Sequence, residues 1–291
     1  MVDLSKKRLD MSSVIRLASW NVNSLKVRLP HLLEWLKLCE EANQPIDLIG
    51  LQELKITDDK FPIQELQNAG YLSLPLGQKT YNGVALLVKK SSLALLNQDP
   101  ETAFLQVQKN IPNFADEQQR LIASTFQLKN TAPIRVICGY FPNGQALSSD
   151  KFAYKMQWLS ALENYLREEL KNFPRLILMG DFNIAPLDED VHDPKAWEGQ
   201  NLVSPQERTF FQNFQELGLI DSFRLFEQAP KSFSWWDYRM MGFRRNAGLR
   251  IDHVMISQAL KTTCTACDID KVPRKWEQPS DHAPVILTLT T

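Results

Sequence analysis

A series of short apolar or alternating segments, spread along the whole chain, most constrains how it can fold. Eight of them have the length and the β-branched and aromatic content of strands. They are Val14 to Trp20, Ile46 to Leu51, Val84 to Lys89, Leu121 to Leu128, Ile134 to Tyr140, Leu176 to Met179, Ile251 to Ile256 and Val285 to Leu289. Their uninterrupted apolar runs fall far short of the roughly 20 residues that a membrane-spanning helix needs. We therefore expect a chain rich in β-sheet that does not span a membrane.

Three further segments have the spacing of amphipathic helices: one near Leu29 to Glu41, one from Lys151 to Lys171, and one between Ser204 and Gly218. In the second, apolar residues recur every three or four positions and form one stripe suited to packing on a sheet. The third begins Ser-Pro-Gln-Glu, a capping box with proline at the first helical position, and ends at a glycine that can cap the helix. Helices interspersed among many strands predict a mixed α/β sandwich.

Composition excludes several classes of protein. Hydrophobic residues make up 44% of the 291, which is enough for a sizeable core. The 33 Lys and Arg residues nearly balance the 34 Asp and Glu residues, and the net charge is -1. The chain is therefore neither disordered nor globally polycationic, and any nucleic acid must be held by a local basic surface.

The chain contains no internal repeat, low-complexity tract or Gly/Ser-rich linker. We expect a polar lead-in over residues 1–13 and a single domain over residues 14–291. The N-terminus lacks the apolar run of a secretory signal, and four sparse cysteines suit a reducing compartment, so we expect a cytoplasmic protein. Cys264 and Cys267 lie in a segment that looks extended, which would direct the two thiols to opposite faces.

Several predicted strands are bordered by small clusters of Asn, Asp, Glu and His. The clusters are Asn21 and Asn23, Gln52 and Glu53, Asp181 and Asn183, and, before the last strand, Ser280, Asp281 and His282. Each cluster alone has an ordinary structural explanation, because Asn and Asp favour turns and a single histidine is more often structural than catalytic. Gathered at one sheet edge, however, carboxylate and amide oxygens form a site of the type that Mg²⁺ or Mn²⁺ prefers.

These residue types also indicate a reaction. A hard cation, a histidine and carboxylates, without a nucleophilic Ser or Cys motif, point to attack of water on a phosphate ester. The sequence has neither a G-x-S-x-G nor a Walker A motif, which disfavours acyl transfer and P-loop nucleotide hydrolysis. No His/Cys grouping favours zinc. We therefore predict a divalent-metal-dependent hydrolase of phosphate esters.

Six ordered blocks resemble the motifs of the exonuclease III type of abasic-site endonuclease, within the endonuclease/exonuclease/phosphatase superfamily. They are Ala18 to Asn23, Gly50 to Glu53, Gly139 to Gly144, Gly180 to Asn183, Gly248 to Asp252 and Pro279 to Pro284. The resemblance spans essentially the whole chain from Arg16 onward. It implies that residues 14–291 form a four-layer α/β sandwich. In that fold two mixed β-sheets pack face to face, are flanked by helices, and carry the active site at one end.

The resemblance further implies roles for individual residues. Glu53 would bind the metal directly, and Asn21 and Asp281 would contribute ligands or water-mediated contacts. Asp181 and Asn183 would orient or activate the attacking water. The expected ion is Mg²⁺, which Mn²⁺ could replace. The full set of candidate metal ligands is Asn21, Glu53, Asp181, Asn183, Asp281 and His282.

His282 would contact the scissile phosphate, with its ring held by Asp252. Such an arrangement fixes the tautomer of the ring and favours the imidazolium. Either His282 or Asp181 could be the general base, and the sequence leaves this choice open. Tyr140 would lie against the phosphate. The implied catalytic set is Tyr140, Asp181, Asn183, Asp252 and His282.

On the substrate side, residues 239–250 contain four arginines and no acidic residue, and they follow the aromatic segment 233–238. Basic residues beside aromatic ones suit a nucleic-acid surface, although a surface loop with a buried aromatic anchor would give the same pattern. The resemblance implies that Trp235 lines a pocket for a flipped sugar without a base. Family members differ in the acidic stretch Asp188 to Asp193, which leaves the balance of activities open. The predicted DNA contacts are Arg120, Asn143, Trp235, Arg244 and Arg245.

We therefore predict a DNA-repair phosphodiesterase that cuts duplex DNA 5′ to abasic sites and acts on blocked 3′ ends. Its activities would include those of a 3′-phosphatase, a 3′-phosphodiesterase and a 3′-to-5′ exonuclease. We expect a monomer without an obligate protein partner. One alternative is a 3′-end-processing enzyme with little abasic-site cleavage, and another is a phosphoesterase of the superfamily with a non-DNA substrate. A third is a DNA-binding module that has lost its chemistry, which the complete set of expected catalytic residue types disfavours.

Overall fold

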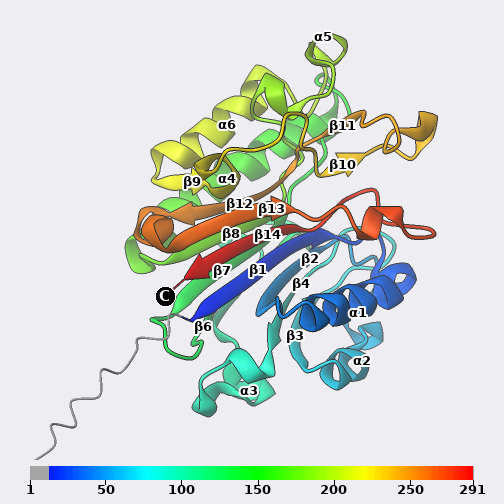
Figure 1. Cartoon of the computed structure of the whole chain (residues 1–291). Helices are drawn as coiled ribbons and strands as arrows, with labels where there is room; N and C mark the ends of the chain where they lie inside the picture. Colours follow the sequence, from blue (N-terminus) through cyan, green and yellow to red (C-terminus); the bar gives the residue numbers. More distant parts are fainter. Residues whose placement is uncertain (1–12, 291) are drawn as a thin grey trace, which may run out of the picture.

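In a computed structural model of the protein, which describes residues 13–290, two six-stranded β-sheets lie between helices (Figure 1). In spatial order, the first sheet contains β13 (Cys264–Ile269), β14 (Val285–Thr290), β1 (Val14–Asn21), β2 (Leu48–Gln52), β4 (Val84–Lys89) and β3 (Tyr71–Leu76). The second contains β5 (Leu105–Lys109), β6 (Leu121–Phe126), β7 (Ile134–Tyr140), β8 (Leu176–Asp181), β12 (Asp252–Ser257) and β9 (Leu219–Asp221). The predicted lead-in over residues 1–13 lies, except for Ser13, outside the described residues.

Both sheets are mixed. β1 and β2 run parallel in the first sheet and β7 and β8 run parallel in the second, whereas the other neighbouring strands are antiparallel. The two sheets pack face to face through one shared core, to which Leu17 and Leu86 contribute from the first sheet and Val136 and Ile177 from the second. Because the central strands are covered on both faces, their sequences are nearly continuous apolar runs.

Helices cover the outer face of each sheet (Figure 1). α1 (Leu25–Glu41) and α2 (Ile63–Asn68) pack on the first sheet, and α4 (Asp150–Asn172) and α6 (Pro205–Glu216) pack on the second. The predicted capping box is present, because the Ser204 hydroxyl accepts from the Glu207 N–H and the Glu207 side chain accepts from the Ser204 N–H. The order helix, sheet, sheet, helix confirms the predicted four-layer α/β sandwich. The short helices α3 (Pro100–Ala103) and α5 (Pro194–Trp197) lie in connecting segments.

The first helix begins at Leu25, four residues before the predicted Leu29. Pro30 therefore lies inside the helix, where it removes only one backbone hydrogen bond near the start. Burial of Leu25 in the core under α1 favours this longer helix. Within the part of the chain that the structure describes, no helix combines the length and the apolar character needed to cross a bilayer.

A small two-stranded sheet, β10 (Trp235–Trp236) and β11 (Gly248–Leu249), projects from one end of the sandwich (Figure 1). The loop that joins its strands carries the predicted basic segment. Isolated bridges connect this sheet to the body, because Trp235 pairs with His282 and Leu249 pairs with Val191. The basic loop is therefore anchored beside the segment that carries His282.

Candidate active site

Strand register brings the predicted polar clusters together at one end of both sheets. In the first sheet, Asn21 at the end of β1 pairs with the last residue of β2, which places Glu53 beside it. In the second sheet, Asp181 at the end of β8 pairs with Tyr140 on one side and with Asp252 on the other. Each sheet therefore contributes its polar strand ends to one site.

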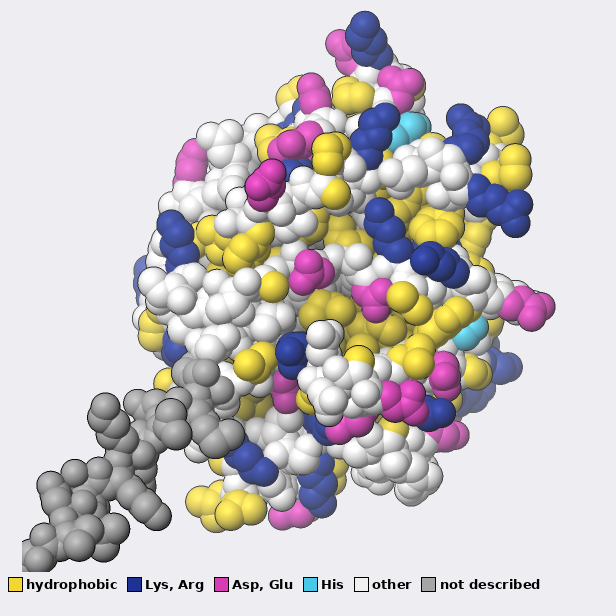
Figure 2. All heavy atoms as spheres, in the orientation of Figure 1, with side chains coloured by type: hydrophobic (Ala, Val, Ile, Leu, Met, Phe, Trp, Pro, Cys, Tyr) yellow, Lys and Arg dark blue, Asp and Glu magenta, His cyan; other side chains and the backbone are white. Residues whose placement is uncertain are grey.

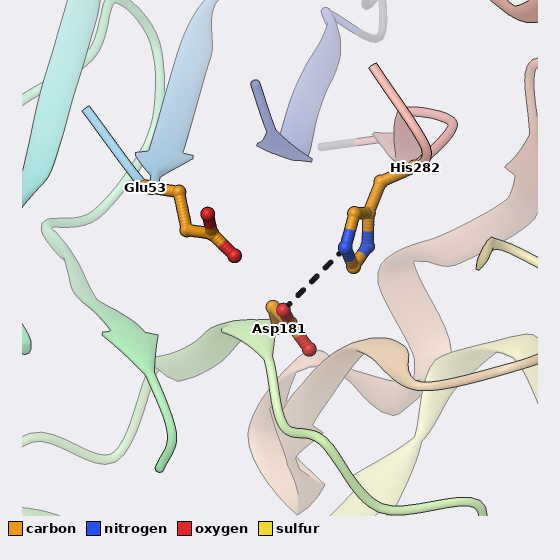
Figure 3. Close-up of side chains that lie close together, drawn as sticks. All are labelled: Glu53, Asp181 and His282. Carbon is orange, nitrogen blue, oxygen red and sulfur yellow. Dashed lines mark ion pairs between the residues drawn. The ribbon is translucent and has the colours of Figure 1, made fainter. Parts of the chain in front are cut away.

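Glu53, Asp181 and His282 point toward one another (Figure 3). One ligand atom from each lies within 4.8 Å of the ligand atoms of the other two. His282 turns its Nε2 toward the group, 3.7 Å from Oδ2 of Asp181. Two carboxylates that converge in this way fit a hard divalent cation, since their oxygens are the ligands such ions prefer.

Donors enclose the Glu53 carboxylate. Its Oε1 accepts hydrogen bonds from the Tyr140 hydroxyl at 2.7 Å and from the Asn21 amide at 3.1 Å, and its Oε2 lies 2.8 Å from the Lys55 ammonium. Burial raises the pKa of Glu53, but Lys55 and these hydrogen bonds outweigh burial and hold the pKa below its usual value. Glu53 is therefore ionised at neutral pH, as a metal ligand must be. The sequence had not indicated Lys55, because a lysine is ordinarily a surface residue.

Asp181 lies buried between Asn21 and His282. Its Oδ2 accepts from the Asn21 amide at 2.9 Å, and its Oδ1 accepts from the backbone N–H of Asn183 at 3.0 Å. Burial raises the pKa of Asp181, His282 opposes this rise, and neighbouring carboxylates add to it. A carboxylate with a raised pKa is suited to accept a proton from water.

Asp252 fixes the His282 ring, because Nδ1 of the ring lies 2.9 Å and 3.1 Å from the two carboxylate oxygens. Asp252 is itself held by the Ser234 hydroxyl, which donates to Oδ2 at 2.7 Å. Burial lowers the pKa of His282, but Asp252, Asp181 and Asp281 together raise it well above its ordinary value. The ring is therefore an imidazolium at neutral pH and presents an N–H donor at Nε2.

Asn21 and Asp281 are near the three converging side chains, but their oxygens have other partners. Oδ1 of Asn21 accepts from the Asn23 backbone N–H at 2.9 Å, so its amide nitrogen faces the carboxylates. The Asp281 carboxylate accepts from the Asn23 amide at 2.8 Å and from the Trp235 indole N–H at 3.0 Å. Metal ligation by these two residues stays a prediction, and the arrangement gives both a part in orienting their neighbours.

Asn183 follows β8 in a left-handed backbone conformation, with φ of 51°. Its Nδ2 donates to the Phe141 carbonyl at 3.1 Å, and its Oδ1 accepts from the Asn143 amide at 3.0 Å. The sequence indicated Asn143 as a DNA contact only. In the structure it also orients Asn183.

A cavity of about 930 Å³ opens beside Tyr140 and is lined by both Arg120 and Asn143. The Arg120 guanidinium lies over the Tyr140 ring, 5.2 Å from its centroid, and donates to the Tyr140 carbonyl at 3.2 Å. Its Nε donates to the Tyr154 hydroxyl at 3.1 Å. The structure therefore brings two of the predicted DNA contacts to a hollow that adjoins the three converging side chains.

Lys and Arg side chains gather over the β10–β11 end of the molecule (Figure 2). Arg244 and Arg245 are exposed in the loop between these strands. Trp235 at the base of the loop packs beside an apolar cluster that contains Leu249 and Ile251. Trp235 thus lies next to the candidate site, where its indole N–H donates to Asp281, and the two arginines lie in the loop that follows it.

Arg250, the last arginine of the same sequence segment, is not available to a substrate. It is buried and pairs with Asp190 at 2.6 Å and with Asp221 at 2.8 Å. Arg208 and Arg224 neutralise further side chains of the acidic stretch around Asp190. Within residues 239–250, the pattern therefore mixes surface arginines with one buried structural arginine.

Known proteins resemble this chain over most of its length. The profile of the Endonuclease/Exonuclease/phosphatase family matches residues 18–282. Exodeoxyribonuclease III of Haemophilus influenzae is 38% identical over 280 residues, which cover 93% of this chain and 98% of that protein. The structure of the 3′ phosphatase NExo from Neisseria bound to a product DNA hairpin is 41% identical, with a TM-score of 0.83 and coverage of 94% and 98% of the two chains. An AP endonuclease from Archaeoglobus fulgidus is 30% identical, with a TM-score of 0.82 and coverage of 94% and 99%.

Proposed function

The chain belongs to the endonuclease/exonuclease/phosphatase family, as a hydrolase of the exonuclease III type, and we propose that it cleaves phosphodiester bonds in damaged duplex DNA. It cuts 5′ to abasic sites, removes phosphates and other blocking groups from 3′ ends, and releases 3′ nucleotides. The convergence of Glu53, Asp181 and His282 carries the proposal, because it joins two carboxylates and an imidazolium at one point. Relatives named as an exodeoxyribonuclease, a 3′ phosphatase and an AP endonuclease support the substrate class.

Glu53 would hold the divalent cation, which is Mg²⁺ or, in its place, Mn²⁺, and Asn21, Asp181, Asn183 and Asp281 are further candidate ligands. When bound, the ion would neutralise charge on the phosphate and stabilise the charge that develops in the transition state. Lys55 and Tyr140 keep Glu53 ionised and oriented for this purpose. The protonated His282 ring is a poor ligand, so its position favours contact with the phosphate over contact with the metal.

Asp181 accepts the proton of the attacking water. Its raised pKa supports this role, and Asn183 is held beside it by the backbone hydrogen bond to Oδ1. The imidazolium of His282 donates from Nε2 to a phosphoryl oxygen, with Asp252 holding the ring in place. A protonated ring cannot accept a second proton, which favours Asp181 over His282 as the general base.

Duplex DNA lies across the end of the molecule at which the polar strand ends of the two sheets meet. Arg244 and Arg245 contact its phosphates, Trp235 lines the pocket for a sugar without a base, and Arg120 and Asn143 contact the strand along the cavity beside Tyr140. The enzyme acts as a monomer without an obligate protein partner. Its four free thiols suit a reducing compartment such as the cytoplasm.

The test uses three end-labelled duplexes, which carry an internal abasic analogue, a 3′ phosphate or an intact recessed 3′ end. Each is incubated with Mg²⁺, Mn²⁺ or EDTA, with Glu53→Gln protein as the matched control. We expect incision at the abasic analogue that EDTA abolishes and that Glu53→Gln lacks. Removal of the 3′ phosphate alone would favour a 3′-end-processing enzyme, an alternative that the likeness to the Neisseria 3′ phosphatase keeps open. Absence of cleavage on all three duplexes with either metal would contradict the proposal.

A further inference from the structure

We propose that Lys155 is a positioning residue for the reaction, because it sets the locations of Asn143 and Asn183 through their backbone carbonyls. The inference rests on the proposed function, since both asparagines belong to the same site. Lys155 lies in α4 with a side-chain exposure of 0%, so it cannot touch a substrate. Its effect on the reaction must pass through the groups that it holds.

Three acceptors surround the Lys155 ammonium. Its Nζ donates to the Asn183 carbonyl at 2.8 Å, to the Asn143 carbonyl at 3.3 Å and to the Glu207 carboxylate. An ammonium has three N–H donors, so every donor has a partner. Because Asn143 follows β7 and Asn183 follows β8, one side chain ties together the two loops that leave neighbouring strands.

Glu207 holds the ammonium from the first turn of α6 and is equally buried. Its Oε1 also accepts from the Leu202 backbone N–H at 2.9 Å. Its Oε2 accepts from the backbone N–H and the hydroxyl of Ser204 at 3.0 Å and 2.7 Å. The pair is therefore built on two helices, and it transmits the position of a rigid scaffold to the loops of the site.

The held carbonyls belong to residues whose orientation matters for the chemistry. Asn183 has a left-handed φ of 51°, its N–H donates to Asp181, and its side chain accepts from Asn143. A shift of the Asn183 backbone would move its N–H away from Asp181 and separate the side-chain amides of Asn143 and Asn183. Displacements of about 1 Å at a reacting centre can lower a rate by as much as about 10²-fold.

Stability alone does not account for the pair. A buried ion pair is often no more stabilising than apolar residues of the same volume, because both charges lose their hydration. What apolar residues could not supply at position 155 is a set of directed donors to two carbonyls. The pair therefore has two properties that substitutions can remove separately. One is the balance of charge between Lys155 and Glu207, and the other is the set of N–H donors that reach the Asn143 and Asn183 carbonyls.

The experiment compares variants that remove these properties separately. In the double variant Lys155→Met and Glu207→Gln, both residues are neutral and similar in shape, but the donors to the two carbonyls are lost. We expect kcat on the abasic duplex to fall about 10- to 100-fold, the range found for residues that hold the side chains of a site in place, with KM unchanged. Glu207→Gln alone retains Lys155, its donors and a side-chain oxygen that can accept from Nζ, so it should lose stability but keep more of kcat than the double variant.

The matched control is a second buried ion pair, Arg135 with Glu169, whose Nε to Oε2 distance is 2.6 Å. Arg135 lies near the start of β7, at the end of the strand opposite to Tyr140. The double variant Arg135→Met and Glu169→Gln should lose stability without loss of kcat. The inference is overturned if the Lys155 double variant keeps wild-type kcat, or if the control lowers kcat equally.

A second measurement does not depend on activity. The side-chain amide signals of Asn143 and Asn183 can be followed by NMR in the same proteins. We expect them to shift in the Lys155 double variant and to stay in place in the Arg135 control. If the wild-type protein cleaves no DNA, the proposed function fails, but the amide signals still test the positioning role. Unchanged amide signals in the Lys155 double variant would reject the positioning role of Lys155.

Discussion

At the scale of single residues, the surroundings of Asp181 determine its chemistry. Burial raises its pKa, and no lysine or arginine is bonded to it among the described residues. We expect Asp181→Asn to bind abasic DNA but to lower the single-turnover cleavage rate by about 10²- to 10⁴-fold, because an amide cannot accept the proton of water. Binding is measured by fluorescence anisotropy and cleavage by quenched flow.

The control for this prediction is Asp188→Asn, which changes an acidic residue whose side chain is 72% exposed and pairs with Arg208. Both its cleavage rate and its affinity should match those of the wild-type protein. Undiminished turnover by Asp181→Asn would remove Asp181 from the role of general base and return that role to His282.

His253 is a second buried histidine with the opposite behaviour. Burial, and then the Arg250 cation, lower the pKa of His253 to about 3. Its Nε2 lies 2.8 Å from the Ile184 carbonyl and its Nδ1 lies 3.0 Å from a guanidinium nitrogen of Arg250. The ring is therefore neutral, with Nε2 donating to the carbonyl and Nδ1 accepting from the guanidinium.

The depressed pKa of His253 predicts a pH dependence of folding. The contribution of the neutral ring to stability is present above the unfolded-state pKa of 6.5 and is lost as the pH falls toward 3. In that window unfolding takes up one proton, so the free energy of unfolding falls by about 1.4 kcal/mol per pH unit from this group. His253→Gln should remove that part of the slope in urea unfolding measured between about pH 6 and about pH 4. An identical slope would mean that the ring is not held neutral.

At the scale of elements, a buried ion cluster fastens the segment between β11 and β12. Arg250 donates to Asp190 and Asp221. Without it, the buried Asp221 would lose its ion pair and the buried Asp190 would keep only Arg224. We expect Arg250→Met to lower the free energy of unfolding by about 3–5 kcal/mol in denaturant titrations. Arg239→Met is the control, because Arg239 pairs with Asp237 on the surface and its side chain is 87% exposed. Equal midpoints for the two variants would contradict a structural role of Arg250.

The loop between β10 and β11 gives a prediction about DNA affinity. Each phosphate contact contributes about 0.9 to the slope of log affinity against log salt concentration. Replacement of both Arg244 and Arg245 by alanine should therefore weaken DNA binding and reduce that slope by about 2 in anisotropy titrations. Lys261→Ala is the control, because Lys261 is exposed in the segment that follows the opposite end of β12. A slope equal to that of the wild-type protein would place the loop outside the interface.

The sequence predicted central elements better than peripheral ones. The central strands of both sheets are buried on two faces, and their apolar runs were evident. The edge strands β3, β5 and β9 were not among the predicted strands. An edge strand has one neighbour and more exposure, as the pattern of β5 shows, so its residues need not be apolar.

One local prediction about the edge strand β13 is wrong for a definite reason. Cys264 and Cys267 were expected to face opposite sides of an extended segment. A register shift between Cys264 and Ala266 adds a residue to this strand, so Cys264 pairs with Leu289 and Cys267 with Leu287. Both thiols consequently pack against the core between the sheets. Such an irregularity depends on pairing with β14, which no local pattern in the sequence reveals.

At the scale of the whole molecule, residue types at strand ends predicted the members of the candidate site but not how they meet. Asn21 and Glu53 come from one sheet and Asp181 from the other, so the hydrogen bond from Asn21 to Asp181 forms only when the sandwich closes. Lys55 and Lys155 were missed because nothing distinguishes a lysine beside a carboxylate from one on the surface until the packing is known. Arg250 was grouped with surface arginines for the same reason.

Closure of the sandwich also links metal binding to folding. Glu53 follows β2 of the first sheet, whereas Asp181 ends β8 of the second, and the charge of Glu53 contributes to the raised pKa of Asp181. A cation held by both carboxylates would relieve this repulsion and would bind only when the two sheets are together. The folded state should therefore gain about 2.7 kcal/mol at a metal concentration one hundred times the Kd.

Thermal unfolding at increasing Mg²⁺ concentration measures this linkage. The Tm of the wild-type protein should rise with the logarithm of the metal concentration once the Kd is exceeded, and Glu53→Gln should abolish the rise. Asp188→Asn, which removes an exposed carboxylate, should retain it. If Glu53→Gln shows the same rise as the wild-type protein, the stabilising ion binds elsewhere. A rise that depends on Glu53 would place the stabilising ion at the candidate site, where the ends of the two sheets meet.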